Sequence, residues 1–138
     1  MSTIIGLNHI TLAVSNLDRS VAFYSGLLGF SIRMHGPTSA YLEAGALWLA
    51  LVADTSVRDG PLKEYSHAAF SVAPADLPIL AAKLTGAGVV CWQQAETIES
   101  FYFLDPDGHK LELHSSDLQC RLAARAALRE PDSSVNYP

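Results

Sequence analysis

The sequence predicts an α+β fold made of two βαβββ modules, whose two four-stranded sheets form an open, barrel-like cleft. Predicted strands and one predicted helix follow in the same order in each half of the chain. A segment also recurs, because residues 8–14 (NHITLAV) match residues 66–72 (SHAAFSV) with His and Val in register. His9 and His67 lie 58 residues apart, which is about the length of one module. Internal repetition of this kind favours a duplicated fold.

The first module covers about residues 5–54. Alternating apolar residues predict a strand over Leu7–Val14, and Ser15 or Asn16 can cap the helix that follows. Apolar residues at helical spacing continue to Gly29, where we expect the helix to end. Three further strands are predicted over Ser31–Met34, Tyr41–Glu43 and Leu47–Val52.

A polar loop over Asp54–Glu64 separates the first module from the second, which covers about residues 65–115. Here the sequence predicts a strand over Tyr65–Val72, a helix over Pro74–Leu84 and three strands over Val89–Trp92, Phe101–Leu104 and Lys110–His114. The segment Asp105–Gly108 (DPDG) predicts a tight turn, because Pro and Gly suit its second and fourth positions. Ser116 and Gln119 resemble a capping box that opens a C-terminal helix over about residues 116–129.

Length and composition indicate a single domain, which we place at residues 1–130 with a tail at 131–138. The chain has 138 residues, 49% of them hydrophobic and 17% charged, which excludes intrinsic disorder. Nine basic and 14 acidic residues give a net charge of -5, which weighs against nucleic-acid binding. No apolar stretch reaches the roughly 18 residues of a membrane span, and no signal peptide is visible. We therefore expect a cytoplasmic protein, with Cys91 and Cys120 as reduced thiols.

Three residues suggest a metal site. His9 and His67 occupy equivalent positions in the two modules. Glu112 lies on the last predicted strand, where its neighbours Leu111 and Leu113 face the other side of the sheet. A carboxylate on the inward face of a strand is costly unless it is paired or binds a cation. Two imidazoles and one carboxylate form a facial triad, which suits Mn²⁺, Fe²⁺, Co²⁺, Ni²⁺ or Zn²⁺ and leaves coordination positions open.

Each of these residues also has a purely structural interpretation. A single histidine on a strand is commonly a hydrogen-bonded core residue, and Glu112 could pair with Lys110 or with a nearby histidine. His114 shares the strand parity of Glu112 and is a rival ligand, although an outer-shell or structural role is favoured. We expect His35 and His109 to be exposed to solvent.

Four stretches resemble a known family. They are Gly6–Val14, Ala40–Glu43 with Leu47–Leu49, Ser100–His114, and Asp117-Leu118 followed by Arg121-Leu122-Ala123. Together they are similar to the vicinal oxygen chelate superfamily, and within it to the manganese-dependent glutathione transferases that inactivate fosfomycin. The DPDG segment marks only the superfamily, whereas the SFYFL segment before it is more selective. The likeness covers about residues 5–125.

The resemblance implies a mechanism and a site. Its metal ligands would be His9, His67 and Glu112, with Mn²⁺ as the expected ion. The resemblance also implies a domain-paired homodimer, in which His9 of one chain would complete a site with His67 and Glu112 of the other. The metal acts as a Lewis acid while the thiolate of glutathione attacks the epoxide carbon.

The remaining site residues also follow from the resemblance. Thr11, Tyr102 and Arg121 would contact the phosphonate, and a guanidinium suits that role because it can hold two oxygens at once. Tyr41 and Trp48 would line the pocket beside the metal. Without the resemblance, Arg121 would be interpreted as a surface residue, and Tyr41 and Trp48 would be interpreted as core residues of their strands. The other predicted substrate-binding residues are Gln93, Thr97 and Ser100.

One segment, Trp92–Ser100, departs from the family pattern. Gln93 replaces a lysine that holds the phosphonate, Ala95 replaces an asparagine, and the loop is one residue shorter and has no glycine. Loss of a cation beside a phosphonate dianion costs about 1.5–3 kcal/mol of binding. These changes weigh against a potassium site and against efficient fosfomycin turnover. Met34–Pro37 replaces an Arg-Trp pair near the thiol channel, which weighs against glutathione itself.

Two other functions fit the same residues. A glyoxalase-like isomerase or a dioxygenase of the same fold would act on another small oxygenated substrate. A non-enzymatic protein of this fold could instead sequester a drug, although such proteins generally lose the metal ligands that this chain keeps.

Overall fold

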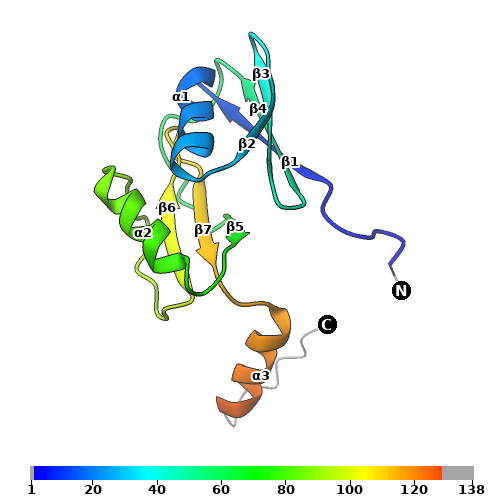
Figure 1. Cartoon of the computed structure of the whole chain (residues 1–138), viewed down its shortest axis with the longest axis vertical. Coiled ribbons are helices and arrows are strands. Elements are labelled where there is room, and N and C mark those ends of the chain that lie inside the picture. Colours follow the sequence, from blue (N-terminus) through cyan, green and yellow to red (C-terminus); the bar gives the residue numbers. More distant parts are fainter. Residues whose placement is uncertain (1, 129–138) are drawn as a thin grey trace.

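The computed structural model describes residues 2–128, which form two β-sheets with a helix packed beside each and a third helix beyond them (Figure 1). The first half contains β1 (His9–Val14), α1 (Leu17–Ala22), η1 (Phe23–Leu27), β2 (Ser31–His35), β3 (Ser39–Ala44) and β4 (Leu47–Ala53). The second half contains β5 (Ala68–Ser71), α2 (Leu77–Gly86), β6 (Ser100–Leu104), β7 (Lys110–His114) and α3 (Leu118–Leu128). The α+β class predicted from the sequence is confirmed.

The first helix begins and ends where the sequence predicts, but its second half is wound differently. The Asn16 side chain accepts a hydrogen bond from the Arg19 N–H at 3.0 Å, and Gly29 has a φ of 78° beyond the end of the helix. Between them, η1 is a π-helix, in which the Leu28 N–H donates to the Phe23 carbonyl. The wider turn accompanies the burial of two consecutive aromatic side chains, Phe23 and Tyr24.

The first sheet has the strand order β1-β4-β3-β2, with β1 parallel to β4 and the other pairs antiparallel. One face packs against α1 and carries the fully buried side chains of Leu42, Leu49 and Leu51. Since side chains alternate along a strand, His9 and Trp48 lie on the opposite face, where they occupy the same row. This second face is the one that can line a cleft.

The second sheet has the order β5-β7-β6 and lacks the fourth strand that we predict over Val89–Trp92. That prediction is wrong. The only backbone bond from this segment to β6 joins the Leu104 N–H to the Val90 carbonyl, and Trp92 is held through its side chain instead. The indole N–H of Trp92 donates to the Leu111 carbonyl at 3.0 Å. β5 is also shorter than predicted and begins after His67.

The turn between β6 and β7 joins the two halves. The Tyr24 hydroxyl donates to Asp105 Oδ2 at 2.7 Å, and both residues are buried. His109 is also buried, with Nε2 donating to the Ala13 carbonyl at 2.7 Å, so the prediction that it is exposed to solvent is wrong. The turn folds back onto β1, which no local pattern reveals. His35 is exposed, as predicted.

The last helix, α3, contains no buried residue and extends away from the two sheets (Figure 1). Asp117 caps it by accepting a hydrogen bond from the Cys120 N–H at 2.8 Å, so the predicted cap at Ser116 is wrong by one residue. The predicted tail at 131–138 lies outside the described residues. Within residues 2–128, no helix has the length and hydrophobicity that crossing a membrane requires.

Candidate metal centre

The open face of the first sheet gathers one set of predicted site residues. The His9 ring stacks on Trp48 with centroids 4.2 Å apart, and Tyr41 meets Trp48 edge-on at 5.2 Å. Thr11 follows on the same face of β1, in the row that Ala50 and Tyr41 continue. Trp48 and Tyr41 are 37% and 40% exposed, although both are large aromatic side chains. The face therefore presents an imidazole and an aromatic wall to whatever covers it.

The open face of the second sheet gathers the other set. His67 immediately precedes β5, and Glu112 lies in the middle of β7, paired with Ala69 and Tyr102 on the two flanking strands. His67 Nε2 and Glu112 Oε1 are 2.9 Å apart. Leu111 and Leu113, which alternate with Glu112, are buried on the other face, as the sequence predicts.

The proton arrangement of His67 fits a metal ligand. Its Nδ1 lies 2.8 Å from the Tyr65 carbonyl, which can only accept, so Nδ1 carries a proton. In the neutral ring, Nε2 then holds a lone pair, and it faces the carboxylate oxygen of Glu112. Two acceptors at this distance require either a proton, on one atom or the other, or a metal cation between them. A carbonyl that fixes the tautomer of a histidine is also the usual support for a metal ligand.

The second oxygen of Glu112 is held by His114. His114 Nδ1 lies 3.0 Å from Glu112 Oε2 and 2.9 Å from the Ser100 hydroxyl. Ser100 is buried, and it was predicted to contact substrate. Here it contacts His114, the residue that holds Glu112, on the same face of the sheet.

Tyr102 completes this group on β6. Its ring packs against His67 at 5.8 Å and against Trp92 at 5.1 Å. Burial raises the pKa of the Tyr102 hydroxyl, and the Glu112 carboxylate and a hydrogen bond to Tyr65 raise it further, while a hydrogen bond from Ser100 acts in the opposite direction. Tyr102 is therefore protonated at neutral pH and available as a donor.

Two members of this group were not singled out from the sequence as site residues. Trp92 lies between Tyr65, His67 and Tyr102, and the Lys110 ammonium lies 5.0 Å from its ring centroid. Tyr65 packs edge-on against His67, with ring centroids 5.0 Å apart. A signal for Tyr65 was present, because it lies two residues before His67 and shares its parity.

Three predicted substrate-binding residues lie apart from the His67–Glu112 pair. Gln93 donates from Nε2 to the Tyr65 hydroxyl at 2.9 Å and so reaches only the edge of the group. Thr97 accepts a hydrogen bond from the Glu99 N–H within an exposed loop. Arg121 lies on α3, exposed, and its described contact is a backbone bond to Asp117.

The two open faces do not meet within one chain. No contact is described between the His9–Trp48 group and the His67–Glu112 group, and residues 2–128 contain no cluster of three His, Cys, Asp or Glu side chains that could hold a metal. Each half thus supplies part of the predicted triad.

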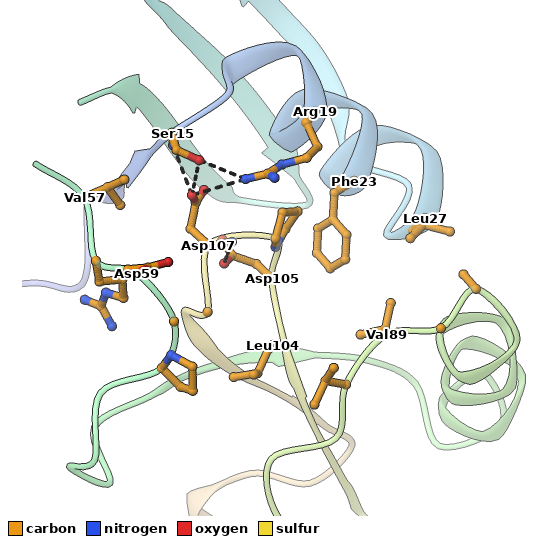
Figure 2. Close-up of a pocket in the computed structure, with 18 of the residues that line it drawn as sticks. Ser15, Arg19, Phe23, Leu27, Val57, Asp59, Val89, Leu104, Asp105 and Asp107 are labelled. Carbon is orange, nitrogen blue, oxygen red and sulfur yellow. Dashed lines mark hydrogen bonds and ion pairs between the residues drawn. The ribbon is translucent and has the colours of Figure 1, made fainter. Parts of the chain in front are cut away.

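Two cavities are lined by neither His67 nor Glu112. One of about 720 Å³ is bordered by α1, residues 55–61 and the β6–β7 turn, where Ser15 and Arg19 both bond Asp107 (Figure 2). It shares no residue with either open face. A second, of about 500 Å³, includes His114, Asp117 and Cys120 and lies beside the His114 support.

Comparison with known proteins identifies the family. The sequence profile of the Glyoxalase/Bleomycin resistance protein/Dioxygenase superfamily matches residues 6–113. The chain belongs to this superfamily. That assignment agrees with the resemblance that the Gly6–Val14 and Ser100–His114 segments indicated.

Within the superfamily, the chain is similar to thiol transferases. It is 50% identical over 121 residues to glutathione transferase FosA of Serratia marcescens, covering 86% of each chain. It is 38% identical over 123 residues to metallothiol transferase FosB of Staphylococcus epidermidis, covering 86% of this chain and 88% of that protein.

The fold is shared with solved superfamily structures. The fosfomycin resistance protein FosX of Listeria monocytogenes superposes with a TM-score of 0.76 at 25% identity, covering 88% of this chain and 99% of that chain. A FosX structure in complex with Mn(II) and a sulfate ion superposes with a TM-score of 0.74 at 26% identity, covering 88% and 98%.

Proposed function

We propose that this protein is a metal-dependent thiol transferase that opens the epoxide ring of fosfomycin with glutathione. The observation that carries the proposal is the His67–Glu112 pair, in which the imidazole Nε2 lies 2.9 Å from the carboxylate. Identity of 50% to a glutathione transferase FosA supports the reaction class and the thiol. The superfamily alone would support only metal chemistry on a small oxygenated substrate.

His9, His67 and Glu112 would hold the metal in this proposal. Two neutral imidazoles and one carboxylate suit a first-row divalent ion, and Mn²⁺ is favoured because a FosX structure contains Mn(II). When bound, the ion supplies Lewis acidity that stabilises the alkoxide formed on ring opening. The potassium site of the family is not part of the proposal, because Ala95 and a shortened loop occupy its position.

A homodimer would complete this site. The His9 group and the His67 group lie on separate open faces in one chain, and both faces are lined by exposed aromatic side chains. Pairing the first sheet of one copy with the second sheet of another would bring three ligands together and cover both walls. This arrangement also explains why, among the described positions, no three His, Cys, Asp or Glu side chains of one chain are placed to hold a metal.

The other residues of the chain bind and orient the reactants. Tyr102, with its proton retained, donates to an oxygen of the phosphonate, and Thr11 and Arg121 supply further donors. Tyr41 and Trp48 form the wall that excludes water beside the reacting carbon. The thiolate forms a C–S bond as the epoxide C–O bond breaks, and the resulting alkoxide takes a proton from solvent. Holding the two reactants in line supplies much of the rate.

Phosphorus NMR tests the proposal directly. Fosfomycin is incubated with the Mn²⁺-loaded protein and glutathione, a second thiol or water alone. We expect an adduct with glutathione that disappears in Glu112→Gln, which keeps the shape of the side chain but removes the charge. Glu99→Gln is the matched control, because Glu99 accepts hydrogen bonds from Ser115 through its backbone carbonyl and lies outside the ligand group. Metal binding without any loss of fosfomycin would contradict the proposal.

A second function has one specific observation in its favour. Gln93 is neutral and is engaged with Tyr65, so this part of the cleft carries one cation fewer than the family pattern. A metalloenzyme of the same fold that acts on a less charged oxygenated substrate, of the glyoxalase or dioxygenase kind, would suit it. The same NMR experiment separates the two, since such an enzyme would bind Mn²⁺ and leave fosfomycin intact.

A further inference from the structure

Tyr65 lies between the predicted ligand His67 and the altered segment that begins at Trp92. Its carbonyl accepts the hydrogen bond from His67 Nδ1 at 2.8 Å, and its hydroxyl is 2.9 Å from Gln93 Nε2. Its ring packs edge-on against the rings of His67 and Trp92, with centroids 5.0 and 5.6 Å away. One residue therefore supports a metal ligand through its backbone and meets the unusual glutamine through its side chain.

The Tyr65 hydroxyl is left with one unused donor. Its oxygen accepts a hydrogen bond from Gln93 Nε2 at 2.9 Å. Its own proton has no acceptor in the part of the chain that the structure describes, and the side chain is at the surface, since Tyr65 is 57% exposed. A phenol that accepts a hydrogen bond is a stronger donor, because chains of hydrogen bonds polarise one another.

We infer that Tyr65 donates a hydrogen bond to an anionic oxygen of the substrate, and that Gln93 is a positioning residue that aims the Tyr65 hydroxyl. The chemical group that Tyr65 would bind is a phosphonate, or a similar oxyanion, beside the metal. This inference rests on the proposed function for the position of the substrate, but it does not depend on ring opening. A neutral amide thus contributes to anion binding through the tyrosine, although it brings no charge of its own.

The test measures binding rather than catalysis. Methylphosphonate, which has no epoxide, is titrated calorimetrically into the full-length, Mn²⁺-loaded protein. We expect Tyr65→Phe to weaken binding about tenfold or more, because a hydrogen bond to a charged group is lost. Gln93→Met, which keeps the length of the side chain without its donor, weakens binding several-fold. Gln94→Met is the matched control and leaves binding unchanged, since no contact of Gln94 is described.

Coupling between the two positions distinguishes positioning from independent contacts. If Gln93 acts through Tyr65, the double variant binds no more weakly than Tyr65→Phe alone, whereas independent contacts would give losses that multiply. Gln93→Lys keeps a donor at this position, so it retains at least wild-type affinity. This variant tests the inference even if Tyr65→Phe loses Mn²⁺ or fails to fold.

Several outcomes would overturn the inference: multiplicative losses, a Gln93→Met variant indistinguishable from Gln94→Met, weakened binding in Gln93→Lys, or a wild-type protein that does not bind methylphosphonate. Failure of the proposed function has a different signature. A protein that binds methylphosphonate with the expected coupling, yet leaves fosfomycin intact in the presence of every thiol, would retain the inference and contradict only the transferase.

Discussion

Asp105 collects donors from both halves of the chain. Its Oδ1 accepts from the backbone N–H groups of Asp107 and His109, and its Oδ2 accepts from the Tyr24 hydroxyl. A buried carboxylate is tolerated only when its oxygens are satisfied in this way. Burial raises the pKa of Tyr24 well above its ordinary value of 10.0, and the neighbouring Asp105 charge raises it further. A single phenol therefore links the first helix to the β6–β7 turn.

Replacing Tyr24 by Phe is expected to lower the free energy of unfolding by about 1–3 kcal/mol, because Asp105 Oδ2 loses its donor. The effect depends on pH. As the pH rises past 10.0, the unfolded chain releases the Tyr24 proton while the folded chain retains it, so the wild type loses stability. Tyr24→Phe lacks this contribution, so the difference between the two proteins shrinks at high pH. Urea unfolding at about pH 8 and about pH 10.5 measures the difference in unfolding free energy between the two proteins.

The exposed Tyr41 provides the control. Tyr41→Phe removes a hydroxyl that makes no hydrogen bond within the described residues, so its cost in unfolding free energy should be small. A difference between wild type and Tyr24→Phe that stays constant with pH would refute the role of the buried phenol.

His114 is expected to act as a support for Glu112 rather than as a metal ligand. Its Nδ1–H is bonded to Glu112 Oε2, which fixes the carboxylate. His114→Ala should weaken Mn²⁺ binding about 10–100-fold, as is usual for outer-shell partners of metal ligands. His114→Asn places an amide N–H near the same position and should restore most of the affinity. Calorimetric Mn²⁺ titration decides this, and a failure of Asn to rescue would favour the rival role as a ligand.

At the scale of elements, the β6–β7 turn lies in close contact with the segment that connects the two halves. Gly108 has a φ of 88°, and a Cβ there would lie 2.5 Å from the Gly60 carbonyl carbon and 2.6 Å from the Pro61 nitrogen. Both neighbours are backbone atoms of the segment that connects the two halves, so neither can rotate away. The conformation of the turn and the course of the connection are therefore fixed together.

Gly108→Ala is expected to destabilise the fold by about 3 kcal/mol, from backbone strain of about 1–2 kcal/mol and overpacking of about 1–3 kcal/mol. Gly45→Ala is the matched control. Gly45 also has a positive φ, 56°, but a Cβ there would meet no atom within 4 Å, so only the strain remains. Thermal and urea unfolding compare the two. Equal losses of unfolding free energy in the two variants would show that the close contact between Gly108 and Gly60 does not contribute.

Sequence patterns predicted those elements that local signals define. Asn16 and Gly29 bound the first helix, and alternation located β2, β3 and β4 to within two residues. The π-helix and the absence of a strand at Val89–Trp92 depend on distant partners, namely the aromatic core around Tyr24 and the Trp92–Leu111 bond. Long-range contacts of this kind leave no trace in spacing.

The same distinction holds for the candidate site. Repetition and strand parity pointed to His67 and Glu112, which lie 2.9 Å apart, and the resemblance placed Tyr102 beside them. Tyr65 was missed as a site residue because its role depends on a carbonyl bond and on a glutamine 28 positions away. The placement of His9 and Arg121 against the other residues remains a prediction, because neither contacts the His67–Glu112 pair within the described residues.

At the scale of the whole molecule, pairing of the first sheet of one copy with the second sheet of another makes a quantitative prediction. His9→Ala and Glu112→Gln each damage both sites of a homodimer. In a heterodimer of the two variants, one site receives the intact His9 and the intact Glu112, and the other receives both defects. Equal amounts that reassociate at random should therefore recover about a quarter of wild-type activity.

The experiment uses co-refolded mixtures and fosfomycin loss as the readout. Each variant refolded alone is the control and should be inactive. A mixture that is no more active than the separate variants would show that each site is built within one chain.

The chain contains two tryptophans, and each lies against a different predicted ligand. The rings of Trp48 and His9 stack with their centroids 4.2 Å apart, and the ring centroids of Trp92 and His67 are 5.3 Å apart. The protein thus carries its own optical reporters, one on each side of the proposed interface. A paramagnetic ion at the shared site would quench both emissions at once, whereas an ion held by the second half alone would quench only Trp92. Trp48→Phe separates the two signals, so occupancy can be followed without any added label.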